Sequence, residues 1–551
     1  MTPRPGRRAG AALALLLAPG LDAQSGDATT RRIREVQISS RNVFPEDDDD
    51  RWFYAAFNTL HVPTAERVIR RELWFDEGDA IDGATVAELE RNLRRLGLFG
   101  EVSAQLVDTG DTADEADLVI DTRDRFSLIA AAGGGFVGGV SGVGVLLSES
   151  NFLGLGKRFT ASYNRNDAGE TSLGIGYFDP QLFGSWHQLD ARVGETEEGP
   201  FFALAIERPI KHLRDPLSYG FSGSYEERNV DYFERGESVA ELPQQGVTAG
   251  GFLARVYGPR HLRARIGLTA NAALTEYGAA RGVSAAQIRV PGDTTAVSAG
   301  PFARIDWADS FLKVRNLDAL DYDEDVRLGL TAELGLSGVL RDETGRDARL
   351  QPAASARFLA AARPLPDTFV TMDVTGAARW YRGDLQGWTA AAALHGYQLS
   401  LPAQTLAASI SFDAVFEVED REPQLTLGED NGLRGYPARE FAGARRVRLN
   451  IEDRIDTGLE AFSFHLGLAA FFDAGWVHSG AQSLSQGEAI KSAGLGLRLG
   501  SSEVLGNNVI RLDLAWPLDE VNGNEYDLSL SFSAGQVFRF FGNSSELRNE
   551  F

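Results

Sequence analysis

The sequence contains no cysteine, and this absence excludes several classes of protein. Without thiols the chain has no disulfide framework, no thiolate nucleophile and no cysteine-ligated metal. Beyond the N-terminus it also lacks any run of 18 or more apolar residues, which is the length that a helix needs to cross a bilayer. We therefore exclude thiol catalysis, a disulfide-rich domain and a helical membrane protein.

Positive charge is also scarce, with 54 Lys and Arg against 78 Asp and Glu and a net charge of -24. Nucleic-acid binding requires clustered Lys and Arg, so we expect no nucleic-acid partner. What the 551 residues do contain is a hydrophobic content of 43% and 60 glycines. The hydrophobic content is enough for a large core, and the glycine content suits strands and turns better than helices.

The first 23 residues have the order of a secretory signal peptide. Arg4, Arg7 and Arg8 precede an apolar stretch over residues 11–18, and the small residue Ala23 follows. A positive start, a short apolar core and a small-residue cleavage site are the features of an exported chain, and they disfavour a buried helix of a cytosolic protein. We expect cleavage after Ala23.

Residues 31–124 combine helical periodicity with short strands. We expect strands at 33–39, 102–107 and 116–122 and helices at 64–73 and 84–96, in the order β-α-α-β-β. The second helix is the clearest, because Val86, Leu89, Leu93 and Leu96 recur on one face and Gly97 follows. Arg91, Arg94 and Arg95 fall on the opposite face, which we expect to be solvated.

This segment resembles a POTRA domain, a periplasmic module of outer-membrane assembly proteins, in its element order and in the stretches 70–79 and 94–99. The resemblance implies that it binds client chains by pairing a strand with an exposed sheet edge. Residues 41–62 depart from the pattern. Their acidic run 46–50 lacks the alternating ligands, central Gly and distal Glu of a calcium loop, so we interpret it as a solvated charge run.

Residues 125–540 show period-2 alternation instead. Between 462 and 476 the even positions are apolar, whereas the odd positions include His465, Gly467, Asp473 and Gly475. Alternation fits a soluble β-sandwich or propeller as well as a barrel, because either has one buried face. Charges at nearly every second position of 446–454, aromatic residues at strand ends and the signal peptide favour a transmembrane β-barrel. The segmentation allows up to about twenty strands of about 9 to 11 residues.

Two motifs suggest a family. The loop Leu433-Arg434-Gly435-Tyr436 and the strand motif Phe471-x-Asp473-x-Gly475 resemble the lumen loop and wall motif of the superfamily that includes BamA, TamA and FhaC. In these surface-antigen barrels the loop arginine docks on the wall carboxylate, which implies a pair between Arg434 and Asp473, and Arg can form two parallel bonds to a carboxylate where Lys cannot. Glu452 faces the same side and is a candidate second partner.

The resemblance implies a barrel of sixteen strands in the bacterial outer membrane, with the POTRA-like domain in the periplasm. It also implies contact with outer-membrane lipids and with unfolded outer-membrane or secreted polypeptides, and periplasmic chaperones or an inner-membrane partner as further candidates. We expect a signal peptide at 1–23, the POTRA-like domain at 31–124, the barrel at 125–540 and an extension at 541–551.

The first and last barrel strands form the seam that closes such a barrel. Gly133, Gly134 and Gly135 lower the strand propensity of the first, and Phe532 and Phe538 lie in the last. We interpret this seam as a lateral gate that opens to client strands. The alternative is that the glycines relieve crowding inside the barrel.

Enzyme signatures are missing. There is no Gly-x-Ser-x-Gly elbow of the lipase domain that some related barrels carry, the seven His residues are scattered, and the glycine cluster at 133–138 lacks the βαβ context of a dinucleotide site. We expect no catalytic residue, cofactor or metal. The functions left are polypeptide insertion or translocation, a passive or structural channel, and dedicated two-partner secretion, which usually has two POTRA domains and a plug helix.

Overall fold

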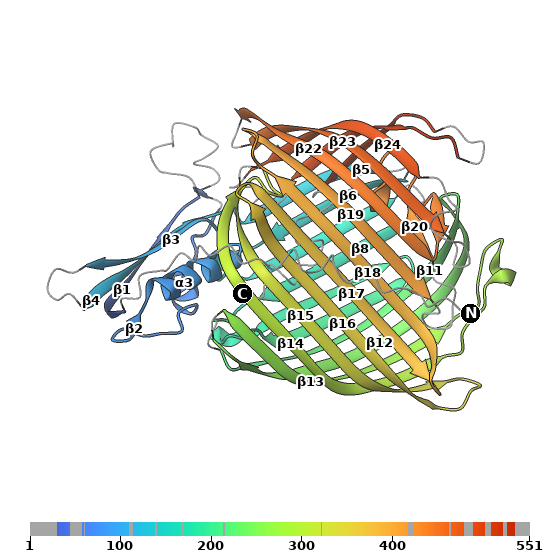
Figure 1. Cartoon of the computed structure of the whole chain (residues 1–551), viewed down its shortest axis with the longest axis horizontal. Helices are drawn as coiled ribbons and strands as arrows, with labels where there is room; N and C mark the ends of the chain where they lie inside the picture. Colours follow the sequence, from blue (N-terminus) through green and yellow to red (C-terminus); the bar gives the residue numbers. More distant parts are fainter. Residues whose placement is uncertain are drawn as a thin grey trace, which may run out of the picture.

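The chain folds into a closed β-barrel with a small α+β domain at one open end (Figure 1). The computed structural model describes residues 30–43, 58–59, 61–108, 114–137, 140–166, 170–212, 215–259, 261–320, 322–416, 424–461, 464–478, 489–501, 509–521 and 526–534. The predicted signal peptide, the acidic run 46–50, Phe538 and the extension 541–551 lie outside these residues. We call the barrel end that carries the small domain the near end, and the opposite end the far end.

The N-terminal domain is one mixed sheet with two helices. Strand β1 (Arg31–Arg41) pairs parallel with β4 (Glu115–Asp124) and antiparallel with β2 (Ala80–Ile81), while β3 (Phe99–Asp108) pairs with the other edge of β4. The sheet order is β2-β1-β4-β3, with α2 (Glu66–Arg70) and α3 (Gly83–Arg95) in the connections. The predicted order lacks β2, because a strand of two residues is too short to show alternation.

Helix α3 has a capping residue at each end, of which the sequence analysis predicted only Gly97. The side chain of Asp82 accepts a hydrogen bond of 2.8 Å from the backbone N–H of Thr85 at the N-terminus. Gly97 follows the C-terminus with a φ of +70°, a conformation that glycine adopts without strain. Between them, Leu89 and Leu93 are fully buried in the domain core.

The barrel comprises twenty strands within the described residues, consecutive barrel strands from β5 to β26 pair antiparallel, and β26 lies next to β5 to close it. The all-β barrel prediction is therefore confirmed. The count matches the upper limit of the segmentation and not the sixteen strands implied by the resemblance. The strands are β5 (Leu128–Val137), β6 (Val140–Glu149), β7 (Arg158–Asn166), β8 (Thr171–Asp179), β9 (Gln188–Thr196), β10 (Gly199–Arg208), β11 (Leu217–Glu234), β12 (Glu237–Tyr257), β13 (Leu262–Tyr277), β14 (Thr294–Arg315), β15 (Asp323–Glu343), β16 (Arg349–Leu365), β17 (Thr368–Tyr381), β18 (Asp384–Gln398), β19 (Gln404–Phe416), β22 (Arg445–Ala461), β23 (Phe464–His478), β24 (Ile490–Gly500), β25 (Ile510–Pro517) and β26 (Ser529–Ala534).

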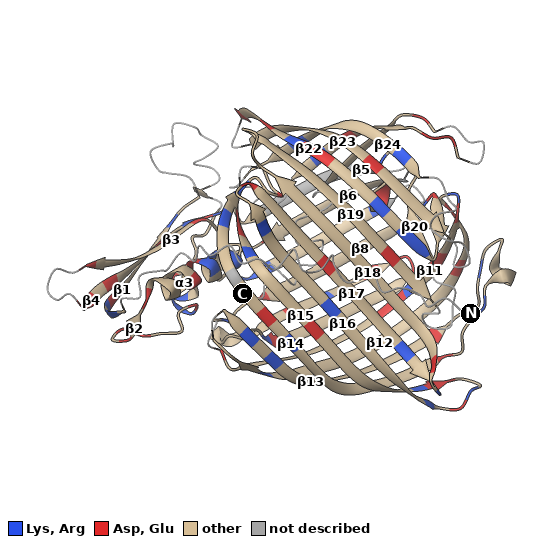
Figure 2. Cartoon of the chain, in the orientation of Figure 1, with Lys and Arg blue, Asp and Glu red and all other residues tan. Residues whose placement is uncertain are grey.

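Alternation along each strand separates an apolar outer face from a polar lumen. In β23, Leu468 is exposed on the outside, whereas Phe471 and Asp473 are buried on the lumen side. Isolated charged positions interrupt otherwise uncharged strand ribbons (Figure 2). Among the described residues no helix is long and apolar enough to cross a membrane.

The N-terminal domain docks on the near-end turns that follow β6, β8 and β10. Asn151 donates to the Thr64 hydroxyl at 2.9 Å, and Gln181 donates to the Glu72 carboxylate at 2.7 Å. Glu72 also forms a buried ion pair of 3.1 Å with Lys211. Burial lowers the pKa of Lys211, and the charge of Glu72 opposes that effect. These contacts join the domain to one side of the barrel mouth.

The arginine face of α3 is a second contact, and here the prediction of a solvated face is wrong. Arg94 Nε lies 2.7 Å from an Asp325 carboxylate oxygen at the start of β15. The Arg91 guanidinium carbon lies 4.1 Å from the centre of the Phe311 ring on β14. Burial against the barrel lowers the pKa of Arg91. A charged helix face that the sequence assigns to water thus faces another part of the same chain.

Candidate functional site

The candidate site is the segment between β19 and β22, which leaves the barrel at the far end and folds back into the lumen. Its short strands β20 (Leu425–Leu427) and β21 (Phe441–Gly443) pair with each other, and the 3-10 helix η6 (Glu429–Asn431) lies between them. The motif predicted from the sequence follows η6. Leu433 and Tyr436 are fully buried and pack with Leu427 in a cluster of their own. We call residues 424–444 the lumen loop.

Arg434 is the centre of the site. Its Nε and Nη2 donate to the two carboxylate oxygens of Asp473 at 2.7 and 2.9 Å, which is a bidentate pair. Its Nη1 lies 3.0 Å from Glu452 and 3.4 Å from Asp513. The guanidinium carbon also stacks 3.4 Å from the centre of the Phe471 ring. The structure thus brings together the three residues that we predicted to interact, Arg434, Asp473 and Glu452, and it adds Asp513 as a further partner.

The electrostatics of the site depend on full burial. Arg434 is 2% exposed, and Glu452 and Asp473 have no exposed surface. A buried charge is costly unless it is paired and hydrogen-bonded, so the three carboxylates need further cations. Arg498 supplies one, at 3.2 Å from Glu452 and 2.6 Å from Asp513. The result is a network that spans β22 to β25.

Two glycines let the lumen loop approach the wall. Gly435 has a φ of +91°, in the left-handed region, and a Cβ there would lie 3.4 Å from Ala515. A Cβ on Gly475 would lie 2.4 Å from the Leu427 side chain, so the wall glycine makes room for the loop. The Tyr436 hydroxyl then donates to the backbone carbonyl of Lys491 at 2.8 Å. Each position of the two predicted motifs therefore has a structural reason.

The network continues toward the near end. Arg454 binds Glu452 at 3.1 Å and donates to the backbone carbonyl of Leu317 at 3.1 Å. Asp318, next in the chain, accepts a hydrogen bond of 2.9 Å from Tyr397. Leu317 and Asp318 are each 1% exposed, so the turn between β14 and β15 is buried in the barrel. We call residues 317–320 the inserted turn.

Several members of the network were not predicted as site residues, among them Asn450, Arg498 and Asp513. Asn450 donates to Asp473 at 2.8 Å and to the Gly432 carbonyl at 2.6 Å. The signal for Asn450 and Asp513 was present, because both occupy the polar face of an alternating strand. Arg498 had the same signal, since it alternates with leucines in β24. Alternation predicts which side of the sheet each residue faces, but not which residues on that side contact one another.

The seam residues lie apart from this network. Gly133, Gly134 and Gly135 pair with residues 142–144 of β6, two of which are also glycines. Phe532 of β26 pairs with Leu512 and is exposed on the outer face. Within the described residues, no group of His, Asp and Glu is arranged to hold a metal ion.

Comparison with known proteins identifies two regions. Residues 425–538 match the model of the Omp85 superfamily domain, and residues 60–124 match POTRA, the surface antigen variable number repeat. Curated proteins give no match.

The chain is also similar to solved structures. One is BamA from Haemophilus ducreyi lacking POTRA domains 1-3 (14% identity, TM-score 0.41, covering 92% of this chain and 84% of that chain). Another is CdiB from Escherichia coli (12% identity, TM-score 0.44, 92% and 76%). A third is CdiB from Acinetobacter baumannii (12% identity, TM-score 0.40, 92% and 74%). The family models confirm the resemblance inferred from the sequence: the chain carries an Omp85 superfamily domain, which includes the lumen loop and its wall, and one POTRA domain.

Proposed function

We propose that this chain is a bacterial outer-membrane factor, with its POTRA domain in the periplasm, that inserts or translocates polypeptides without catalysing a chemical reaction. The observation that carries the proposal is the clamp of Arg434 on Asp473 and Glu452. Burying an ionic network contributes little net stability, because desolvation offsets the attraction, whereas it fixes one geometry strongly. A passive pore has no need of a lumen loop fixed in this way.

The route that we propose for clients is a lateral opening between β5 and β26. Three consecutive glycines in β5 face a partner strand that is itself glycine-rich, so few side-chain contacts reinforce the β5–β6 pairing. The same glycines offer few side-chain contacts to β26 on the other side of β5, which lowers the free energy needed to open the seam. Because antiparallel strands present unpaired N–H and C=O groups once separated, an open seam can template a client strand.

The POTRA sheet offers a second edge for clients. In the order β2-β1-β4-β3, the outer edge of β3 has no strand partner among the described residues, and β3 is ten residues long. At the opposite edge β2 pairs only with Arg31 and Arg32 of β1, and further along β1 the backbone of Val36 is bonded by the side chains of Glu77 and Arg70. We propose that an extended client segment pairs with β3 before it reaches the barrel.

Reconstitution tests the function. The purified protein in liposomes should accelerate the membrane insertion of an unfolded β-barrel client, and Arg434→Ala should abolish the acceleration. Arg357→Ala is the matched control, because Arg357 pairs with Asp373 on the neighbouring strand β17 and neither residue belongs to the Arg434 network. Steady ion conductance without acceleration by the parent protein would contradict the proposal and favour a channel.

The seam can be tested separately because the chain has no native cysteine. Single cysteines in residues 130–135 of β5 are combined with single cysteines in residues 530–533 of β26, and pairs that oxidise are retained. Oxidised protein should lose insertion activity and regain it on reduction. Full activity in the oxidised state would exclude the lateral opening while leaving transport through the lumen intact.

A further inference from the structure

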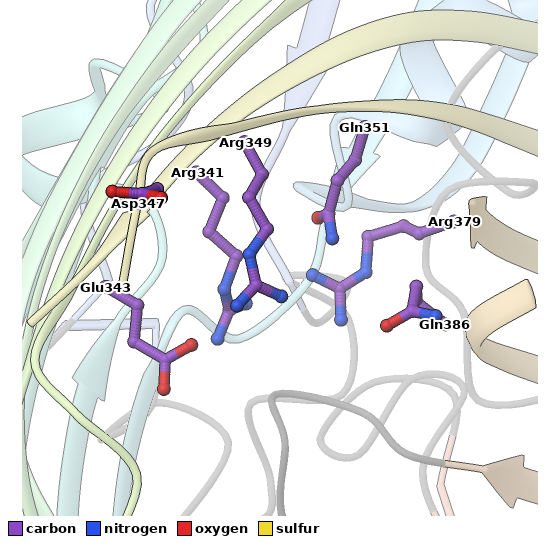
Figure 3. Close-up of a pocket in the computed structure, with 7 residues that line it drawn as sticks. All are labelled: Arg341, Glu343, Asp347, Arg349, Gln351, Arg379 and Gln386. Carbon is purple, nitrogen blue, oxygen red and sulfur yellow. The ribbon is translucent and has the colours of Figure 1, made fainter. Parts of the chain in front are cut away.

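A second polar site lies in the lumen near the far end, on β15, β16 and β17. One pocket is lined by three arginines, two glutamines and two carboxylates: Arg341, Arg349, Arg379, Gln351, Gln386, Glu343 and Asp347. Figure 3 shows the three guanidinium groups converging on the same hollow from three adjacent strands. None of these residues belongs to the Arg434 network, and the function proposed above does not use them.

The register makes this convergence unusual. Arg341 on β15 is directly opposite Arg349 on β16, so two like charges form a cross-strand pair. Like charges in that position destabilise a sheet. Arg379 lies on the next strand, β17. It pairs there with Ala353 of β16, which is two residues from Gln351. Glu343 and Asp347 supply two negative charges against the three guanidinium groups, so the pocket keeps a net positive charge that favours binding of an anion.

Neighbouring side chains hold the arginines in place. Arg341 lies 3.5 Å from the Thr294 hydroxyl, and the Arg349 guanidinium stacks 5.2 Å from the centre of the Tyr381 ring. The carboxylate of Glu343, which also lines the pocket, binds Arg346 at 2.9 Å. Arg341 and Gln351 are 8% and 4% exposed, so the floor of the pocket is buried. The geometry is therefore preorganised for a ligand.

We propose that this pocket binds a phosphoryl group. Each guanidinium presents two parallel N–H donors, and three such forks from three strands match the oxygens of a tetrahedral oxyanion. One fork already satisfies the two oxygens of a carboxylate, so an acidic side chain would use only part of the site. The phosphoryl group can come from inorganic phosphate or from a phosphorylated sugar that enters from the far end. The assignment is independent of polypeptide transport.

Calorimetric titration of the detergent-purified full chain tests the site. Sodium phosphate is titrated at constant ionic strength, with sodium chloride as the blank and a hexose phosphate as a second ligand. Phosphate binding should weaken at least tenfold in the double variant R341Q/R379Q, and R379Q alone should weaken it severalfold. The control R357Q removes one charge from the same strand as Arg349 and should bind phosphate like the parent protein.

The second ligand distinguishes the source. If hexose phosphate binds more tightly than inorganic phosphate, and the same variants lose this binding, the source is a phosphorylated sugar. If inorganic phosphate binds more tightly, the source is free phosphate. No phosphate binding by the parent protein would overturn the proposal, as would equal binding by the double variant. Tighter binding of a penta-aspartate peptide than of either phosphate would overturn it in favour of acidic polypeptide.

Discussion

At the scale of single residues, the site depends on the shape of one guanidinium. Arg434 reaches Asp473 through two bonds and Glu452 through a third, while its flat face covers the Phe471 ring. A lysine ammonium is a compact charge with no fork and no flat face, so it cannot make this set of contacts. The pair was implied by the resemblance of the two motifs to a known family, and the alternation in the sequence independently gave the lumen facing of Asp473.

Arg434→Lys should therefore release the lumen loop although the charge is kept. A hydrogen bond to a charged group contributes about 1.5 to 3 kcal/mol, and we expect a loss of that order in the unfolding free energy because the lysine cannot form the bidentate pair. Limited proteolysis of the lumen loop and unfolding in denaturant measure the two effects.

Arg439→Lys is the control in the same loop. Arg439 lies 3.6 Å from Asp430, and both side chains are partly exposed, so the change should cost less than about 1 kcal/mol. Equal effects of the two substitutions would show that the fork of Arg434 contributes nothing specific.

At the scale of elements, the inserted turn is the feature that sequence reasoning could not supply. Its Asp318 meets Tyr397, which is 79 positions away, and Leu317 meets Arg454, which is 137 positions away. Alternation and turn signals are local, so they place a strand and its facing but not a turn that folds back into the lumen. The strand count differs in this respect. Local alternation allowed up to about twenty strands, which agrees with the twenty that pair in the barrel, whereas the family resemblance implied sixteen.

Asp318→Asn should loosen the inserted turn, because a neutral amide keeps the hydrogen bond to Tyr397 in part but loses the charge near Arg454. We expect a severalfold increase in single-channel conductance in planar bilayers, since the turn lies within the lumen. Asp367→Asn, in the exposed near-end turn between β16 and β17, should leave the conductance unchanged. Unchanged conductance in both variants would show that the inserted turn does not obstruct ions.

At the scale of the whole molecule, buried polar contacts join the POTRA domain to the barrel. The ion pair of Glu72 with Lys211 is central, and Gln181 contributes a hydrogen bond to the same carboxylate. Sequence reasoning assigned the nearby Arg91 and Arg94 to solvent, because a helix considered alone gives no sign of a second domain beside it.

Lys211→Met should destabilise the docked domain by about 3 kcal/mol, because it leaves the Glu72 charge buried without its cation. Adding Glu72→Gln should recover much of that loss, since the glutamine oxygen still accepts a hydrogen bond from Gln181. Denaturant unfolding of the two single variants and the double variant measures this coupling. Additive losses would show that the two side chains do not act as a pair.

The positions of the two stiffened regions have a mechanical consequence for the barrel wall. The Arg434 network ties β22 through β25 to the lumen loop, and the POTRA contacts tie the turns after β6, β8 and β10 to one rigid domain. The β5–β26 boundary lies between these two braced arcs. A ring that is stiff on both sides of a compliant joint concentrates any applied bending at that joint. Lateral tension in the surrounding bilayer would therefore bend the barrel wall first between β5 and β26, whichever part of the circumference the tension acts on.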